Sequence, residues 1–303
     1  MLASTPRLVA VVVTYEPNMA QLEALLSVLA NQVHRVVLIN NGSCDPVSML
    51  TLDGGITNVD ILNLGENFGL AAAQNEGIRQ ARSLSAEYVL FLDQDSLPAP
   101  DMVQRLLVVA KEKQAAGIRL ASVGPRYFDV LQASLRPFVR VRGLRVQRFD
   151  CEHANQVIEV DHLISSGSLI PMTALDAIGG MREELFIDYV DTEWSLRAWR
   201  LGYRSFGVCN ATMRHGLGDR PYRFFGRYVP IHAPLRHYYL FRNTLWLYRQ
   251  GWIPWTWKVA TARRVLLKFL FFAVVPRDRL GHVKMMVRGL WDGLRGRMGR
   301  FDS

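Results

Sequence analysis

The stretch Tyr88-Val89-Leu90-Phe91-Leu92-Asp93-Gln94-Asp95-Ser96 joins an apolar run directly to two carboxylates, about a third of the way along a chain of 303 residues. A short continuous apolar run is typical of a strand that is buried on both faces, so Asp93 and Asp95 should lie where this strand meets solvent. Mg²⁺ is usually held by one or two carboxylates together with substrate phosphates. Asp-x-Asp alone is more often an acidic turn, but its place at a strand end indicates a cation that binds with a phosphorylated ligand.

Strands and helices alternate through the first third of the chain. Apolar runs predict strands over residues 8–13, 35–39, 59–62 and 88–92, and helical spacing predicts helices after Asn18, over residues 70–83 and over residues 100–114. This order predicts an α/β fold with a mostly parallel central sheet, flanked by helices and joined by right-handed crossovers.

Polar residues follow the predicted strands. They are Thr14-Tyr15, Asn40-Asn41, Asn63 to Asn67 and Asp93 to Asp95. In open α/β sheets, ligands bind beyond the carboxyl ends of the strands. Because all these clusters should meet at one edge of the sheet, we expect them to share a ligand.

The next part of the chain is less regular. It is predicted to contain irregular strands and a variable loop over residues 119–160, an interrupted strand over residues 162–170, a helix over residues 192–201 and a strand over residues 205–209. Small residues in the interrupted strand would let a ligand or another backbone approach closely. Asp191 is expected to be the N-cap of the helix.

The charge is unevenly distributed. Residues 1–213 contain 18 Lys or Arg and 23 Asp or Glu, whereas residues 214–303 contain 18 and 4. Such asymmetry indicates an anionic partner for the tail, either nucleic acid or a membrane surface. Aromatic residues between Tyr238 and Phe272 are interleaved with basic residues, which favours a lipid headgroup interface over nucleic acid. The same rings are equally suited to packing a C-terminal helical subdomain.

The cysteines and apolar segments bear on the compartment. Cys44, Cys151 and Cys209 are odd in number and widely separated, which argues against a disulfide framework or a zinc cluster and favours the reducing cytoplasm. No signal peptide is recognisable at the N-terminus. The longest apolar run, Val265–Val275, is interrupted by Lys268 and is far shorter than the roughly 20 residues that cross a bilayer. The chain is therefore expected to lie on a membrane, if it meets one, without crossing it.

Six stretches in order resemble the family 2 glycosyltransferases with the GT-A fold, most closely the rhamnosyltransferase branch. They are Val12–Pro17, Asn40–Ser43, Asn67–Gly77, Phe91–Ser96, Phe186–Trp194 and His215. The resemblance covers roughly residues 8–220. It implies a GT-A catalytic domain over residues 1–220, with a nucleotide-sugar half (1–117) and an acceptor half (118–220), followed by a C-terminal helical region over residues 221–303.

The resemblance also implies site residues. The nucleobase would be held by Thr14, Tyr15, Asn40 and Asn41; the rest of the donor by Asn67, Gly69, Asn75, Asp93 and Gln94; and a divalent cation, Mg²⁺ or Mn²⁺, by Asp93, Asp95 and His215. Asn40 stands where the family usually has an aspartate, and it equally fits an ordinary turn. Asn67 and Gly69 would open a helix whose N–H groups receive nucleotide oxygens. They also fit an N-cap and a tight turn, and both can be true at once.

Asp191 is the candidate general base, because the attacking hydroxyl must lose its proton as the new bond forms. At a helix N-terminus it would be kept ionised. Asp188 is the fallback, and the like charges of Asp188, Asp191 and Glu193 would need a cation or donor among them. A single base predicts inversion at the sugar carbon. By resemblance alone, the donor would be dTDP-L-rhamnose and the acceptor a lipid-linked saccharide or glycolipid at the inner face of the cytoplasmic membrane.

Three other functions compete with this one. A phosphatase of the Asp-x-Asp type would carry the pair after its first strand, and a dinucleotide-binding oxidoreductase would have Gly-x-Gly-x-x-Gly in place of Thr14–Pro17. A non-catalytic nucleotide-sugar or membrane-docking module would bind the donor without turnover. A family 2 glycosyltransferase with another nucleotide sugar also remains open.

Overall fold

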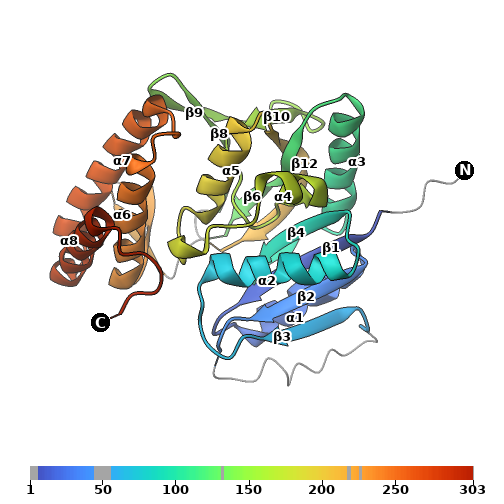
Figure 1. Ribbon diagram of the computed structural model, residues 1–303, viewed down its shortest axis with the longest axis horizontal. Coiled ribbons are helices and arrows are strands. Elements are labelled where there is room, and N and C mark those ends of the chain that lie inside the picture. Colours follow the sequence, from blue (N-terminus) through green and yellow to red (C-terminus); the bar gives the residue numbers. More distant parts are fainter. Residues whose placement is uncertain (1–5, 44–55, 131–132, 217–219, 225–226, 303) are drawn as a thin grey trace, which may run out of the picture.

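The structure is a computed structural model, and it describes residues 6–43, 56–130, 133–216, 220–224 and 227–302. A large mixed sheet forms its centre (Figure 1). Its strands are β1 (Leu8–Thr14), β2 (Arg35–Asn40), β3 (Val59–Asn63), β4 (Tyr88–Asp93), β5 (Ser96–Pro98), β6 (Leu120–Asp129), β7 (Ser134–Leu135), β10 (Val157–Val160), β11 (Leu169–Pro171) and β12 (Arg204–His215). Two separate hairpins are formed by β8 (Phe138–Arg142) with β9 (Arg145–Phe149), and by β13 (Arg220–Phe224) with β14 (Arg227–Ile231).

The sheet order is β10-β12-β6-β11-β4-β1-β2-β3. The neighbours β4-β1-β2-β3 are all parallel, as is the pair of β6 and β12, which confirms the mostly parallel sheet. Only the last residues of the predicted strand 162–170 are extended, in β11, which runs antiparallel to β4 and β6. The preceding loop is held by Gly167, whose φ is +84° and whose N–H donates to the Phe91 carbonyl. The expected close approach of two backbones therefore occurs in a loop.

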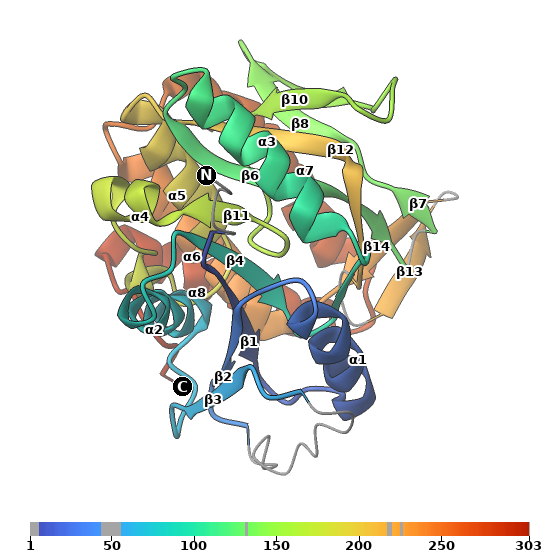
Figure 2. The same ribbon diagram turned by 90° about the vertical axis from the view of Figure 1, so that its right-hand side faces the viewer.

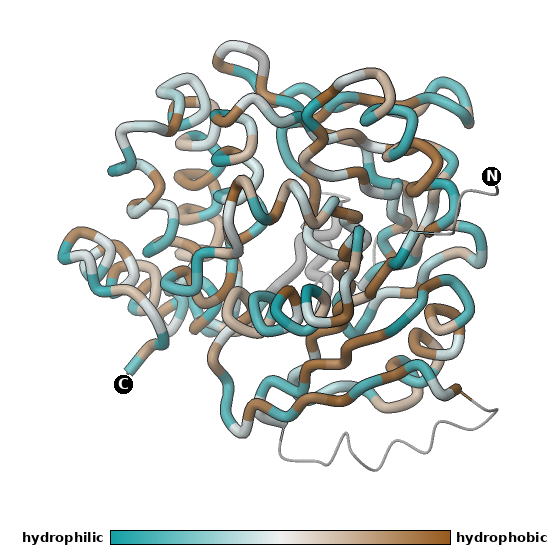
Figure 3. Tube along the Cα trace, turned by 45° about the vertical axis from the view of Figure 1, so that its right-hand side comes forward, coloured by the Kyte–Doolittle hydropathy of each residue, from teal (hydrophilic) through white to brown (hydrophobic). Residues whose placement is uncertain are grey.

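Alternate residues of β1 point to opposite faces of the sheet, and each face has its own core. Ala10 and Val12 pack with α1 (Met19–Ala30) and α3 (Met102–Ala115). Val9 and Val11 pack with α2 (Leu70–Ser83), α4 (Met172–Ile178) and α5 (Val190–Arg200). Figure 3 shows the hydrophobic central strands between these layers. Coverage of both faces explains why the strands are continuously apolar.

The predicted helices of the N-terminal half are confirmed. Asn18 is the N-cap of α1, and its side chain accepts from the Gln21 N–H at 3.2 Å. The expectation for α5 is wrong in one respect, because the helix begins at Val190 and its N-cap is Tyr189, in the left-handed region. Asp191 instead lies in the first turn.

The C-terminal part is not helical from its start. Residues 221–231 belong mainly to the hairpin of β13 and β14, which corrects the expected all-helical region. The helices α6 (Pro234–Arg249), α7 (Trp255–Val274) and α8 (Arg279–Arg295) follow. They stand together at one end of the sheet, beside α5 (Figures 1 and 2). Within the described residues, no helix is both long enough and apolar enough to cross a bilayer.

The prediction of unpaired cysteines is wrong for two of the three. Cys151 and Cys209 form a disulfide, with their Cα atoms 5.8 Å apart. The antiparallel pairing of β10 with β12 brings the two together across 58 residues of sequence, and spacing alone could not show this. Cys44 lies outside the described residues. Because disulfides persist in oxidising environments, the cysteines no longer support a reducing compartment.

Candidate active site

The carboxyl ends of the strands meet at one edge of the sheet. Thr14, Asn40, Asn63 and Asp93 are the last residues of β1 to β4, and these strands are parallel. β6 and β12 run in the same direction, since β11 is antiparallel to both β4 and β6. His215, the last residue of β12, therefore reaches the same edge, where it pairs in register with Ser96.

Asp93, Asp95 and His215 form a compact cluster. One ligand atom from each lies within 4.8 Å of the others. Nδ1 of His215 is 3.3 Å from a carboxylate oxygen of Asp95, and Nε2 is 3.9 Å from one of Asp93. The Ser96 hydroxyl is 2.9 Å from the same Nδ1 and 2.6 Å from the Ser166 hydroxyl, which also accepts from the Asp93 N–H. These contacts fix both the turn and the imidazole.

The cluster fits a divalent cation. Burial raises the pKa of Asp93, an effect that the charge of His215 opposes and the charge of Asp95 reinforces. Burial disfavours charge on His215, but its hydrogen bond to Asp95 and the nearby carboxylates raise its pKa nonetheless. The site thus attracts positive charge, and two carboxylates with one imidazole are a set of ligands that transition-metal dications accept.

The side chains expected to bind the nucleobase lie at the ends of β1 and β2. The Gln94 amide clamps the loop after β1, because it accepts from the Tyr15 N–H at 2.7 Å and donates to the Tyr15 carbonyl at 3.1 Å. The Thr14 hydroxyl is buried and donates to the Ile39 carbonyl. Asn40 is also buried, and its side-chain oxygen accepts from the Ser43 N–H at 2.9 Å. Tyr15 is exposed and free to contact a ligand.

The N-terminus of α2 is closed by protein. The Leu70 N–H donates to the Phe186 carbonyl at 2.7 Å, and the Gly69 N–H donates to Asn67. These N–H groups therefore have partners within the protein, and their contact with nucleotide oxygens stays a prediction. Gly69 has a φ of +89°, and a Cβ there would lie 2.7 Å from the Phe186 carbonyl oxygen. Glycine is therefore required at position 69, because only glycine lets the loop that precedes α5 approach the N-terminus of α2 so closely.

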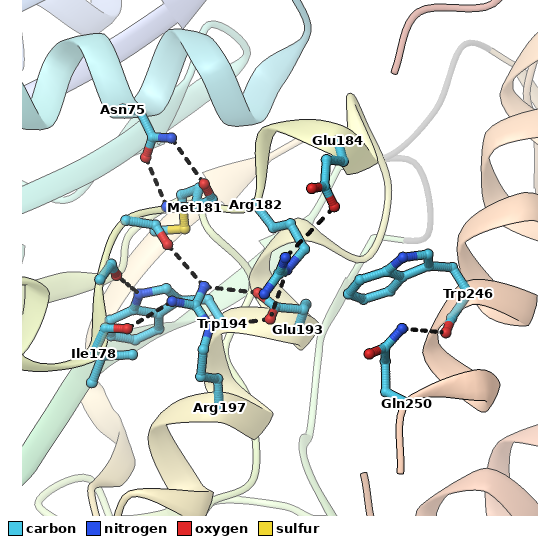
Figure 4. A network of polar contacts seen from close by, with 12 residues as sticks. Asn75, Ile178, Met181, Arg182, Glu184, Glu193, Trp194, Arg197, Trp246 and Gln250 are labelled. Atoms are coloured by element: carbon cyan, nitrogen blue, oxygen red, sulfur yellow. Dashed lines mark hydrogen bonds and ion pairs between the residues drawn. The ribbon is translucent and has the colours of Figure 1, made fainter. Parts of the chain in front are cut away.

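Asn75 lies in a network between α2 and the segment before α5 (Figure 4). Its side chain accepts from the Met181 N–H at 2.7 Å and donates to the Met181 carbonyl and to Glu183. Deeper in the network, the fully buried Glu193 pairs with Arg197 at 2.8 Å and with Arg182 at 3.4 Å. Asn75 thus joins two segments of the fold, and its role in donor binding stays a prediction.

The loop before α5 carries the candidate bases. Phe186, Asp188 and Tyr189 all have φ near +64°, a conformation that costs about 1–3 kcal/mol for each such residue. Asp188 pairs with Arg236 at 3.3 Å. Among the described contacts of Asp188, Asp191 and Glu193, only Asp191 makes no ion pair. The expected crowding of like charges is thus relieved by arginines.

The surroundings of Asp191 suit a base. Its side chain accepts from the Thr192 N–H at 2.7 Å. Burial raises its pKa, while the charge of His162 and the bonds from Thr192 lower it. Because the pKa of Asp191 is raised on balance, burial outweighs the effect of the helix N-terminus, which was expected to keep this carboxylate ionised. The charge of Asp191 also contributes to the raised pKa of Asp93, so the two carboxylates are close enough to interact electrostatically.

Three functional candidates were not predicted. Arg236, at the start of α6, pairs with Asp188, and its charge opposes the rise in the pKa of Asp93. The fully buried Arg242 and Asn243 donate to carbonyls of the loop before α5. In the sequence they are part of a broadly basic, aromatic tail. Only the burial of Arg242 and Asn243, which the sequence does not show, distinguishes them from the exposed polar residues of this tail.

Comparisons with solved structures define the class. The chain superposes on GalNAc-T7 with UDP, GalNAc and Mn²⁺ with a TM-score of 0.57 and 16% identity, covering 72% of this chain and 44% of that one. It superposes on S. aureus TarS 1–349 in complex with UDP-GlcNAc with a TM-score of 0.55 and 16% identity, covering 96% and 81%. The predicted GT-A fold is confirmed.

Sequence comparisons give the family. The glycosyl transferase family 2 model matches residues 10–163. The chain is also 31% identical to the dTDP-rhamnosyl transferase RfbF of Shigella flexneri over 289 residues, which are 95% of each protein. This chain belongs to glycosyltransferase family 2 and is a glycosyltransferase. Its resemblance to the rhamnosyltransferases is confirmed, and the phosphatase, the oxidoreductase and the non-catalytic module are set aside.

Proposed function

We propose that this chain transfers L-rhamnose from dTDP-L-rhamnose to a hydroxyl group of a lipid-linked or amphiphilic acceptor, with inversion at the sugar carbon. The single observation that carries the donor is the similarity to a dTDP-rhamnosyl transferase along 95% of the chain. The acceptor and the stereochemistry rest on features of this chain.

The donor is proposed to lie across the edge formed by β1, β2 and β4. Tyr15, Asn40 and Asn41 would hold the base, with Thr14 and Gln94 shaping the loop around it. Asp93, Asp95 and His215 would hold a divalent cation, which supplies charge neutralisation for the departing diphosphate when bound. Arg236 carries a positive charge that acts on Asp93, so it is placed to attract the same diphosphate.

Asp191 is the proposed base and Asp188 the fallback. Asp191 has the stronger claim because Asp188 is already paired with Arg236. A carboxylate whose pKa is raised by burial accepts a proton more readily than an exposed aspartate. With one free carboxylate, the hydroxyl attacks directly, its proton passes to Asp191 and the dTDP leaves from the opposite side. Inversion is the expected outcome.

The C-terminal helices are proposed to rest on a membrane surface. α7 exposes Trp255, Val259, Leu266, Leu270 and Val274, a stripe with helical spacing. α8 exposes Leu280, Val287, Trp291 and Leu294, also at helical spacing. Exposed apolar stripes beside Lys and Arg are typical of helices that lie in a lipid headgroup layer. The cytoplasmic side of the membrane follows from the family resemblance.

Acceptor-free hydrolysis of the donor tests the first part. With Mn²⁺, dTDP-L-rhamnose should be hydrolysed slowly, and faster than dTDP-glucose or UDP-GlcNAc, as followed by chromatography of released nucleotide. Preference for another nucleotide sugar would overturn the assigned donor while leaving the enzyme class intact. For the membrane, flotation with anionic liposomes should retain the protein at low salt and lose it at high salt. Equal flotation with neutral liposomes would refute the electrostatic part.

A further inference from the structure

A cavity of about 530 Å³ lies between the β8–β9 hairpin, the start of α5 and one side of α7. Much of its wall is apolar and includes Val141, Leu240, Val265 and Phe272. Cavities of this size with apolar walls and a few polar groups are typical of small-molecule sites. None of the residues proposed to hold the nucleotide or the cation lines it, so it offers room for a second substrate.

One end of the cavity lies beside the candidate base. His162 and Thr192 line it. The Thr192 N–H donates to Asp191, and the charge of His162 acts on the same carboxylate. Tyr189, which immediately precedes α5, also lines the cavity. A molecule in the cavity would therefore reach the residues on either side of Asp191, which itself lines a neighbouring small cavity.

The wall of the cavity also contains cations. Arg264 and Lys268 lie one turn apart on α7 and both line the cavity; within the described part of the chain, neither makes an ion pair within 4 Å. Arg140 also lines the cavity but pairs with Glu159 at 2.9 Å. Burial lowers the pKa of Lys268, which the more distant charge of Asp188 only partly offsets. Lys268 is partly buried and Arg264 is exposed, and a cation beside apolar side chains is stabilised when an anion pairs with it.

The cavity is continuous with the exposed stripe of α7. Leu267 lines the cavity and is itself more than half exposed. Its neighbours Leu266, Leu270 and Val274 are exposed on the same helix. An apolar chain could thus leave the cavity along Leu267 toward these exposed apolar side chains.

We infer that this cavity binds an acceptor whose sugar is joined to an apolar chain through phosphate. The phosphate lies between Arg264 and Lys268, the chain leaves along Leu267 toward the exposed stripe, and the sugar hydroxyl is directed to Asp191. The inference rests on the proposed function, since it names the acceptor of the same site. Its distinguishing claim is that phosphate and apolar chain are required together.

The full chain can be titrated with dodecyl phosphate below its micelle concentration, with tryptophan fluorescence as the readout because Trp257 lines the cavity. Saturable binding is expected, with dodecyl maltoside and inorganic phosphate each bound more than about tenfold more weakly. Arg264→Gln and Lys268→Gln should each weaken dodecyl phosphate binding by about tenfold, the loss typical of a charged hydrogen bond.

Arg263→Gln is the matched control. It removes the same charge from the next residue of α7 but does not line this cavity, and it should leave the affinity within about twofold. Val141→Trp should obstruct the cavity and weaken binding without changing any charge. Equal affinity in Arg263→Gln and Arg264→Gln, or equal binding of the uncharged amphiphile, would overturn the inference.

The same variants separate this inference from the proposed function. Donor affinity and acceptor-free hydrolysis of dTDP-L-rhamnose should be unchanged in Arg264→Gln and Lys268→Gln, because neither residue belongs to the proposed donor site. If the wild type neither binds nor hydrolyses any nucleotide sugar, the proposed function fails. Binding of dodecyl phosphate still tests whether the cavity accepts an apolar chain joined to phosphate. If hydrolysis proceeds and dodecyl phosphate does not bind, only the acceptor assignment fails.

Discussion

The side-chain amide of Asn243 donates to the main-chain carbonyl of Asp188 at 2.9 Å, linking the middle of α6 to the loop that carries the candidate bases. The same amide donates to the carbonyls of Leu185 and Ile187. This loop contains residues with positive φ, whose conformational cost must be offset by surrounding contacts. The C-terminal helices therefore help to shape the active site.

Asn243→Ala should destabilise the protein and impair turnover. Asn243 is fully buried, and loop carbonyls left without a donor cost about 1–3 kcal/mol. Urea denaturation should show this loss, and kcat should fall more than donor affinity because the base moves and the nucleotide site does not. The control is Asn155→Ala, whose exposed side chain accepts a hydrogen bond from Asn210. Equal stability of the two variants would contradict the role of Asn243.

Gly69 and Gly65 form a natural pair for a substitution test. Both have positive φ, but a Cβ at Gly65 meets nothing within 4 Å, whereas one at Gly69 meets Phe186. Gly65→Ala should cost only the strain of a left-handed alanine, about 1–2 kcal/mol. Gly69→Ala should cost about 1–3 kcal/mol more from the clash, and it should lower kcat by displacing the loop. Thermal denaturation and turnover distinguish the two variants.

The sequence predicts the sheet and the edge where the site lies, because both depend on local patterns. Continuous apolar runs specify buried strands, and polar residues at their ends specify the ligand-binding edge. Asp93, Asp95 and His215 could be placed together because each follows a strand, although His215 also required the family resemblance.

Other features depend on contacts between distant segments, which local pattern does not show. The disulfide of Cys151 and Cys209 arises from strand pairing, and the closure of α2 arises from the Phe186 carbonyl. The structural role of Asn75 likewise depends on a loop more than 100 residues away. Asp191 lies two residues after the N-cap of α5, because Tyr189, in the left-handed region, takes the cap position that the local pattern gave to Asp191.

The proposed cation site of Asp93, Asp95 and His215 predicts the effect of removing each of these side chains. Asp95→Asn and His215→Ala should each weaken Mn²⁺ binding in the presence of dTDP by more than about tenfold. Loss of a residue that only supports a metal ligand already weakens metal binding by about 10–100-fold, and loss of the ligand itself should weaken it at least as much. Electron paramagnetic resonance of free Mn²⁺ measures this. Asp101→Asn, which removes a carboxylate paired with Arg105, should have no effect. Activity lost to EDTA should return with added Mn²⁺.

Asp191→Asn should lower kcat by about 10²–10⁴-fold, the usual contribution of a general base, with donor affinity unchanged. Activity should require the carboxylate form, so it should fall as the pH falls through the pKa of Asp191. Because burial raises that pKa, the loss should begin at a higher pH than for an exposed aspartate.

His162→Gln tests whether the loss of activity at low pH, the acidic limb of the pH profile, is caused by protonation of Asp191. Burial lowers the pKa of His162, but at the acidic pH where the imidazole is protonated its charge lowers the pKa of Asp191. Its removal should therefore move the loss of activity to higher pH. The profile of kcat/KM against pH measures the shift. A limb that does not move in His162→Gln would assign the titration to another group.

Reduction of the disulfide should destabilise the protein. The bond closes a loop across 58 residues, for which the chain-entropy model gives about 4 kcal/mol. Cys151→Ser or treatment with dithiothreitol should therefore lower Tm, whereas Cys44→Ser should not affect the bond. Thiol counting under denaturing conditions should find one free thiol before reduction and three after it. Three free thiols in protein alkylated at lysis would show that the bond is absent in the cell.

The attachment of α6 to the loop before α5 has a practical consequence for protein engineering. Chimeras that exchange the last third of the chain between related enzymes, in order to change acceptor preference, would pair a foreign helix with a native catalytic turn. Residues 184–188 and α6 should consequently be transplanted as one cassette, since each is shaped to the other.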